Sequence, residues 1–180
     1  MSSDGGGSMD EDGFWRLVDE VWAGEANITP GVLDRLTARL ERLSYDEVDQ
    51  CLRWFDVAHR QAYTWDLWAA GSLIQDSMGD DGFTDFRSWV IAHGRTVFEG
   101  ALADPDTLAD LHWRNDLEDM GLAEHYAARI VDEWSTRHRH DPETGYWQAP
   151  QEQPTGEEFP EDDDEWFAAR FPRLWAAVRD

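Results

Sequence analysis

The segment from Ala62 to Gln75 is AYTWDLWAAGSLIQ, and it is the most apolar part of the chain. Its only charged residue is Asp66, and apolar side chains, alanines included, fill most of the other positions. A segment of this length and composition is typical of a helix that is buried in a protein core. We therefore predict a buried central helix here, loosened at Gly71 because glycine is a poor helix former.

Amphipathic segments lie on both sides of this central helix. Apolar residues recur in them every three or four positions, which is the period of a helix with one buried face. The predicted helices span residues 13–23, 30–43, 44–58, 83–93, 95–102 and 116–137. Two of them have clear start signals, because Thr29 precedes Pro30 and Ser44 forms a capping box with Glu47. No segment alternates with the period of a strand, so we predict an all-α fold.

The two ends of the chain differ in composition from this helical part. Residues 1–9 are rich in Gly and Ser, which is typical of a flexible tail. Residues 10–137 are predicted to form one compact helical domain, with Asn115 or Asp116 capping its last helix. Residues 138–163 contain several prolines and an acidic run, which indicates a linker or extended arm. Residues 164–180 are predicted to form a short helix that docks back on the domain, because their aromatic side chains are too apolar to leave in water. Pro172 is expected to break or kink it.

Acidic residues dominate the charge of the chain. Its 180 residues include 39 acidic and 15 basic side chains, all of the latter Arg, which gives a formal net charge of −24 at pH 7. Nucleic acids attract basic proteins, because basic side chains displace their counterions. Anionic membrane surfaces attract basic segments as well. We therefore expect no direct nucleic-acid binding and no membrane binding, and an acidic surface instead favours a basic protein as partner.

Three further features narrow the class of protein. No apolar run approaches the roughly 18 residues of a membrane-spanning helix, so an integral membrane protein is not expected. No charged segment followed by an apolar one opens the chain, which favours a cytoplasmic protein. The only cysteine, Cys51, lies between apolar residues of a predicted helix. We expect it to be a buried apolar side chain rather than a nucleophile.

The aromatic and charged residues around the central helix are the best candidates for a recognition surface. The candidate binding residues are Trp65, Asp66, Trp68, Asp85, Arg87 and Arg95. One interpretation is structural: the rings are core, and Arg87 or Arg95 pairs with a half-buried Asp66 or Asp85. The other is a pocket with an arginine at its mouth, suited to a small anion or a peptide carboxylate.

Two groups of residues have side chains of the types that bind metals. Carboxylates gather in residues 76–85, but their spacing is not that of a calcium loop. The favoured interpretation is that Asp80 or Asp81 caps the next helix. His138 and His140 lie between arginines, whose charge opposes a cation, so a solvated helix end is the better explanation. We predict no metal site, no cofactor and no catalytic residues.

Three blocks along the chain together resemble a known family. They are DGFWRLVD at residues 12–19, AYTWDLWAA at residues 62–70, and DDGFTDFRSW at residues 80–89, followed by Gly94-Arg95. The sequence resembles the bacterial Domain of Unknown Function 4240 family, common in actinobacteria, over roughly residues 9–111. The resemblance implies a mainly helical bacterial domain of uncharacterised role, and it transfers no site residues to this chain.

Three functional hypotheses follow. The leading one is a non-enzymatic interaction or regulatory module whose acidic surface binds a basic protein, with DNA mimicry as one variant. The alternative is a small-ligand pocket protein or an unrecognised enzyme built around residues 63–68 and 83–95. An enzyme is the less favoured class, because no phosphate loop, nucleophile elbow or zinc helix is present. The third is that the charge only keeps a Trp-rich protein soluble.

Overall fold

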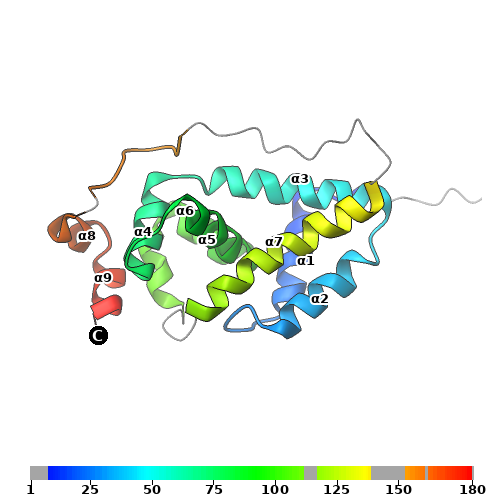
Figure 1. The fold of residues 1–180 in the computed structure, drawn as a ribbon, viewed down its shortest axis with the longest axis horizontal. Helices are drawn as coiled ribbons and strands as arrows, with labels where there is room; N and C mark the ends of the chain where they lie inside the picture. The colour runs from blue at the N-terminus through cyan, green and yellow to red at the C-terminus, as the bar shows by residue number, and fades with distance from the viewer. Residues whose placement is uncertain (1–7, 112–116, 139–152, 161, 180) are drawn as a thin grey trace, which may run out of the picture.

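The computed structural model describes residues 8–111, 117–138, 153–160 and 162–179, and this part of the chain is all-α, as predicted (Figure 1). The helices are α1 (Glu11–Trp22), α2 (Pro30–Leu40), α3 (Tyr45–Gln61), α4 (Trp65–Gln75), α5 (Asp80–Ala92), α6 (Arg95–Ala103), the 3-10 helix η1 (Pro105–Asp110), α7 (Leu117–His138), α8 (Asp164–Arg170) and α9 (Pro172–Arg179). In the described residues, none of these helices combines the length and apolarity that crossing a membrane requires.

Side-chain caps begin three of the central helices. The Thr29 hydroxyl accepts a backbone N–H of the first turn of α2, and Pro30 occupies the first helical position. Ser44 and Glu47 form the complete capping box, with hydrogen bonds of 3.3 Å and 2.8 Å, at the start of α3. The Thr64 hydroxyl caps α4 by accepting the Leu67 N–H at 3.1 Å, which places the start of this helix at Trp65 rather than at the predicted residue 62.

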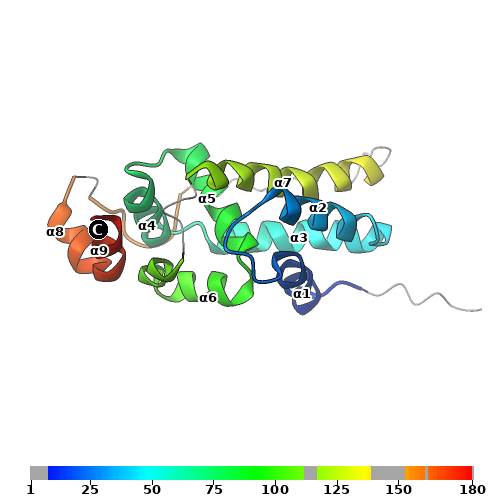
Figure 2. The same ribbon diagram turned by 90° about the horizontal axis from the view of Figure 1, so that it is seen from below.

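Helix α5 lies in the middle of the core. Its apolar face consists of Phe83, Phe86 and Trp89, each of which is 0% exposed. Helix α7 crosses α5 and also packs on α2 and α3, while α1 and α6 contact α5 from other sides (Figures 1 and 2). Cys51 of α3 is fully buried, and burial raises the pKa of its thiol to about 12. The predicted burial of this side chain in the core is confirmed.

The C-terminal segment forms two helices rather than one. Phe171 leaves the helical conformation, with φ −130° and ψ 65°, and Pro172 begins α9. Both helices lie at one end of the molecule, where α9 packs on η1 and α4 (Figure 2). Phe171 and Leu174 provide the apolar contact and are 0% exposed.

A buried carboxylate from η1 holds the start of α9. Asp106 is 5% exposed and accepts the backbone N–H groups of Arg173 at 3.1 Å and of Leu174 at 2.8 Å. These N–H groups belong to the first turn of α9, where no carbonyl of the same helix is available to accept them. Asp106 therefore caps α9 from a different element, and the helix dipole adds to the attraction.

Residues 153–160 run beside the start of α4. The Thr155 N–H donates to the Tyr63 carbonyl at 3.0 Å, and the Trp65 N–H donates to the Thr155 carbonyl at 2.9 Å. This isolated bridge fastens the described part of the predicted arm to the domain. The rest of the arm, residues 1–7 of the predicted tail and the predicted cap at 115 or 116 lie outside the described residues.

Two predictions about segment ends are wrong. Asp80 and Asp81 do not cap α5, because Gly79 is the N-cap and no side chain bonds there. Both aspartates instead occupy the first turn, where the helix dipole favours negative charge. Met9, assigned to the tail, is 8% exposed, and its carbonyl accepts the Trp54 indole N–H at 3.2 Å.

The turn between α5 and α6 generates a test of the packing. Gly94 has φ +93°, and a Cβ there would collide with the Asp19 carboxylate, which accepts the Arg95 N–H at 3.1 Å. We expect Gly94→Ala to lower the free energy of unfolding by about 2–4 kcal/mol, through backbone strain and this collision. Urea titration measures the change.

Gly24→Ala is the matched control for this substitution. Gly24 also has a positive φ, +76°, but a Cβ there meets nothing within 4 Å. The Gly24→Ala variant should lose only about 1–2 kcal/mol of unfolding free energy, because only backbone strain acts on it. Equal losses in the two variants would contradict the role assigned to the contact with Asp19.

The cap on α9 generates a second test. We expect Asp106→Ala to release α8 and α9, because the N–H groups of α9 lose a buried charged acceptor worth about 1.5–3 kcal/mol. Limited proteolysis should then cut residues 164–179 roughly tenfold faster or more. The control is Asp110→Ala, which removes only an exposed ion pair with Arg173 and should leave the cleavage rate nearly unchanged. Equal rates in both variants would show that the cap does not hold the segment.

Candidate functional site

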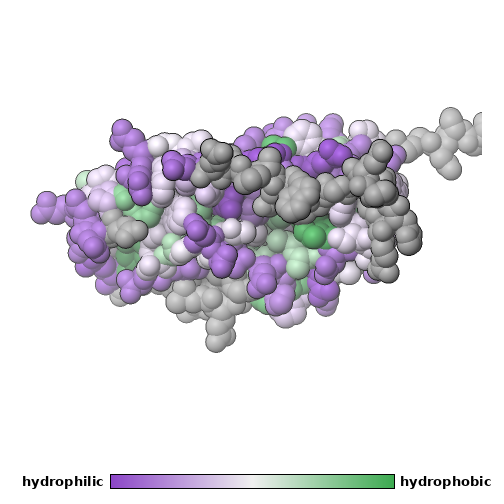
Figure 3. Space-filling model, turned by 45° about the horizontal axis from the view of Figure 1, so that its top comes forward, coloured by the Kyte–Doolittle hydropathy of each residue, from purple (hydrophilic) through white to green (hydrophobic). Residues whose placement is uncertain are grey.

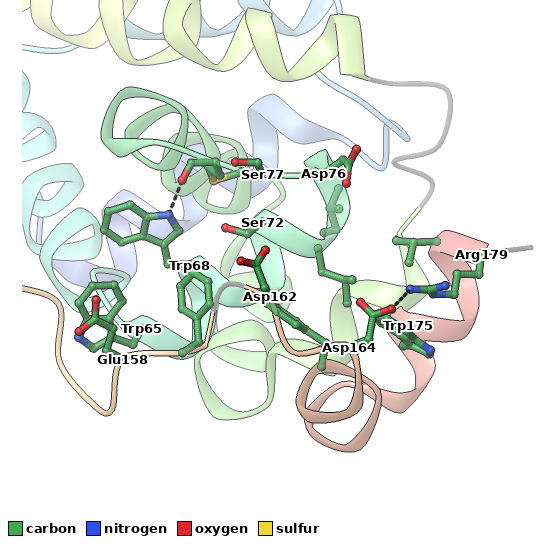
Figure 4. A pocket seen from close by; sticks show the side chains of 16 residues that line it. Trp65, Trp68, Ser72, Asp76, Ser77, Glu158, Asp162, Asp164, Trp175 and Arg179 are labelled. Atoms are coloured by element: carbon green, nitrogen blue, oxygen red, sulfur yellow. Dashed lines mark hydrogen bonds and ion pairs between the residues drawn. The ribbon is translucent and has the colours of Figure 1, made fainter.

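A groove lies between α4 and the C-terminal segment (Figure 4). One side is formed by α4 and the loop that follows it, residues 65–78, and the other by residues 158–167 and 175–179. The groove encloses about 740 Å³. This volume falls within the range of roughly 300–1,000 Å³ that is typical of ligand sites.

Stacked indole rings form the wall of the groove on the α4 side. Trp65 and Trp68 stack with ring centroids 5.3 Å apart and an interplanar angle of 15°. Phe159 meets Trp65 edge-on at 6.0 Å. The Trp68 indole N–H donates to the Met78 carbonyl at 2.8 Å, and the Trp68 ring stacks on the buried Phe83 at 4.7 Å. The wall is therefore fixed to the core and does not depend on a ligand for its shape.

Carboxylates surround this wall. The acidic residues that line the groove are Asp76, Glu158, Asp162 and Asp164. Among the described lining residues, Arg179 is the only cation, and it pairs with Asp164 at 3.1 Å. Its guanidinium also lies 3.6 Å from the centre of the Trp175 ring. The remaining carboxylates leave the groove with an excess of negative charge, which favours a cationic occupant.

Of the six candidate residues from the sequence, only Trp65 and Trp68 line the groove. Asp66 pairs with Arg170 at 2.5 Å and so ties the start of α4 to α8. Asp85 is half-buried on α5, where burial and the nearby carboxylates of α5 and α7 raise its pKa. The structure therefore does not gather the six residues at one surface.

The two candidate arginines have other roles. Arg87 donates to a backbone carbonyl of α3 at 3.0 Å and lies over the Tyr63 ring at 4.8 Å. Arg95 begins α6 and pairs with Asp12 and Glu99, each at 2.6 Å. The expected ion pairs with Asp66 or Asp85 are therefore wrong. Neither arginine lines the groove, which consequently lacks the predicted arginine mouth for an anion.

Half of the lining residues belong to the C-terminal segment, in which the sequence analysis named no candidate binding residue. Glu158, Phe159 and Asp162 belong to the predicted arm, and Trp175 and Arg179 to the predicted docking helix. The available indication was the acidic run of residues 157–165, which lies directly before an aromatic segment. The sequence alone does not show which part of the domain this run meets.

A comparison with models of protein families agrees with the resemblance that the three sequence blocks indicate. The model of a family described as "Protein of unknown function (DUF4240)" matches residues 9–131. The chain belongs to the DUF4240 family. A search of the curated proteins and a search of the solved structures found no match. Helix α4 lies inside the region that matches the DUF4240 model, whereas residues 158–179 lie beyond it, so the groove joins the family region to a segment outside it.

Metal-binding side chains do not gather in the described part of this DUF4240 protein. No three or more His, Cys, Asp or Glu residues among those described are placed to hold a metal ion. The carboxylates of residues 76–85 instead lie on the loop before α5 and on α5 itself. His140 and the side chain of His138 lie outside the described residues.

A serine–histidine pair joins α3 to α5 in the core. His59 Nε2 and Ser88 Oγ are 2.9 Å apart, and the two residues are 3% and 1% exposed. The Ser88 hydroxyl also donates to the Thr84 carbonyl at 3.3 Å. Because a hydroxyl has one proton, the imidazole then donates to Ser88 rather than accepting from it. The pair is therefore a buried contact that joins α3 to α5.

Two buried histidines make the stability of the fold depend on pH. Burial lowers the pKa of His59 to about 3, with the Arg87 charge adding to the effect, and burial lowers the pKa of His93 to about 4. The His93 ring lies against Trp22 and Trp89, with centroid distances of 4.1 Å and 4.2 Å. In an unfolded chain each of these imidazoles takes up a proton near pH 6.5, whereas in the folded chain both stay neutral at that pH. The stabilisation that comes from the two neutral imidazoles is therefore fully present above pH 6.5 and is lost as the pH falls.

We expect the free energy of unfolding to fall by about 3 kcal/mol between pH 7.5 and 5.5, or about 1.4 kcal/mol for each buried histidine. Urea titrations at the two pH values measure this difference. His59→Gln should halve the difference, while His125→Gln, at an exposed position of α7, should leave it unchanged. A wild-type protein with the same stability at both pH values would contradict the neutral buried state of these imidazoles.

Proposed function

We propose that this DUF4240 protein is a cytoplasmic bacterial interaction module that binds a basic protein and performs no chemistry of its own. The observation that carries the proposal is the groove, in which four lining carboxylates surround an aromatic wall. Basic side chains have an apolar stem and a cationic end. A surface that offers both rings and carboxylates complements both parts of such a side chain.

The rest of the surface supports the same kind of partner. Hydrophilic residues cover most of the described surface on the face shown in Figure 3, with small hydrophobic patches between them. The net charge of −24 extends a negative potential beyond the groove itself. Such a potential accelerates the encounter with a basic protein, and the acceleration weakens as salt screens the charges.

A small organic cation is a second candidate occupant. The volume of about 740 Å³ accommodates a small molecule, and the same rings and carboxylates would bind its charge. The protein partner remains the first choice because the lining carboxylates Asp76, Glu158, Asp162 and Asp164 are themselves exposed. A site for a small molecule more often encloses its polar groups.

Capture of partners from a lysate of the source cells tests the proposed function. The baits are the wild-type protein and a variant with four acidic residues of the C-terminal segment neutralised. The substitutions are Glu157→Gln, Glu158→Gln, Asp162→Asn and Glu165→Gln. We expect a basic protein on the wild-type bait, elution that increases with salt, and at least a roughly tenfold loss on the variant bait.

A second variant controls for net charge alone. It removes the same number of exposed charges from other helices and loops of the domain. The substitutions are Glu41→Gln, Asp46→Asn, Glu124→Gln and Asp132→Asn. Equal loss on both variant baits would contradict a role for the C-terminal segment, and no captured protein on any bait would leave the charge as an aid to solubility. A DNA-binding protein as the captured partner would favour the mimicry variant of the proposal.

A further inference from the structure

Arg179 shows how one end of the groove holds a guanidinium group. Its guanidinium carbon lies 3.6 Å from the centre of the Trp175 ring, and a side-chain nitrogen lies 3.1 Å from the Asp164 carboxylate. An arginine can do both at once, because its planar face stacks on a ring while its N–H groups point outward in the plane. The same combination recurs in the pairing of Arg170 with Asp66 beside the Phe171 ring.

The other end of the groove offers the same two kinds of group. Trp65 and Phe159 supply the rings, and both are only partly buried. Figure 4 shows Glu158 at the Trp65 end of the groove, and Asp162 between this end and the Arg179 end. No described residue forms an ion pair with Glu158 or Asp162. Within the part of the chain that the structure describes, this end therefore has the rings and the carboxylates but no cation.

We propose that an arginine side chain of a basic protein partner occupies this end of the groove. Its guanidinium lies against the Trp65 ring, and its N–H groups donate to the carboxylates of Glu158 and Asp162. This inference rests on the proposed function and names the side chain that the groove recognises. Lysine fits less well, because its ammonium group is compact, strongly hydrated and unable to stack as a plane.

The charge of the chain argues against a second copy of the protein as the source of this arginine. Each copy carries a formal net charge of −24, so two copies repel each other before any contact forms. Arg170 and Arg179 of the C-terminal helices already pair with Asp66 and Asp164. A separate basic protein complements both the groove and the field around it.

Calorimetric titration with short peptides tests the assignment. The probe is the acetylated and amidated pentapeptide Gly-Arg-Gly-Arg-Gly, titrated into the full chain at low salt, and its lysine and citrulline counterparts complete the series. We expect the arginine peptide to bind at least about fivefold more tightly than the lysine peptide, and the neutral citrulline peptide not to bind measurably. The double variant Glu158→Gln with Asp162→Asn should bind the arginine peptide about tenfold or more weakly than the wild-type chain does.

The matched control is Glu157→Gln with Glu165→Gln. These residues are exposed in the same segment, do not line the groove, and carry the same charge as the pair that is tested. The control variant should lose no more than about twofold in affinity for the arginine peptide, because exposed charges act weakly at a distance. Melting curves of both double variants verify that they remain folded.

The outcomes separate the two proposals. If the arginine and lysine peptides bind equally, or if both double variants lose affinity equally, the arginine site is overturned while an acidic surface for basic proteins stands. If neither cationic peptide binds the wild-type chain even at low salt, both proposals fail. Arginine-selective binding that only the Glu158 and Asp162 substitutions weaken supports both.

Discussion

Phe83, Phe86 and Trp89 lie along one face of α5, and each is fully withdrawn from water. Their rings follow one another at centroid distances of 6.5 Å and 5.6 Å, and Trp68 of α4 continues the series at 4.7 Å from Phe83. Trp65 then stacks on Trp68 and carries the series into the groove. Burial of large rings dominates the energetics of a core. The orientation of the groove wall is thus set by the same packing that holds the domain together.

The predictions that held are those in which a local pattern has one structural solution. The capping box of Ser44 and Glu47 and the Thr29-Pro30 start depend only on neighbouring residues, and the structure contains both. The cap predicted at Asp80 or Asp81 failed because Gly79 serves as the N-cap and the aspartates lie one step inside the helix. Periodicity also predicted a helix over residues 116–137, which corresponds to α7, and its residues Tyr126, Ile130 and Trp134 are buried.

The candidate site was predictable only in part, because its two halves lie far apart in the sequence. Trp65 and Trp68 stood out as aromatic residues of the central helix. Phe159 and Arg179, which line the same groove, belong to segments whose composition indicates an arm and a terminal helix, without showing where either one docks. That position depends on the buried Asp106 carboxylate and on the Thr155 bridge, which are contacts between distant residues. No pattern of residue spacing along the sequence predicts contacts between residues this far apart.

The two sides of the groove are translated at different times. Trp65 is synthesised about 90 residues before Phe159, an interval of roughly 5–20 s at about 5–20 residues per second. During that time the aromatic edge of α4 has neither Phe159 nor α9 beside it, so a nascent or truncated chain exposes these rings to solvent. Residues 158–160, 162–167 and 175–179 are therefore needed before this edge of α4 becomes one wall of a groove.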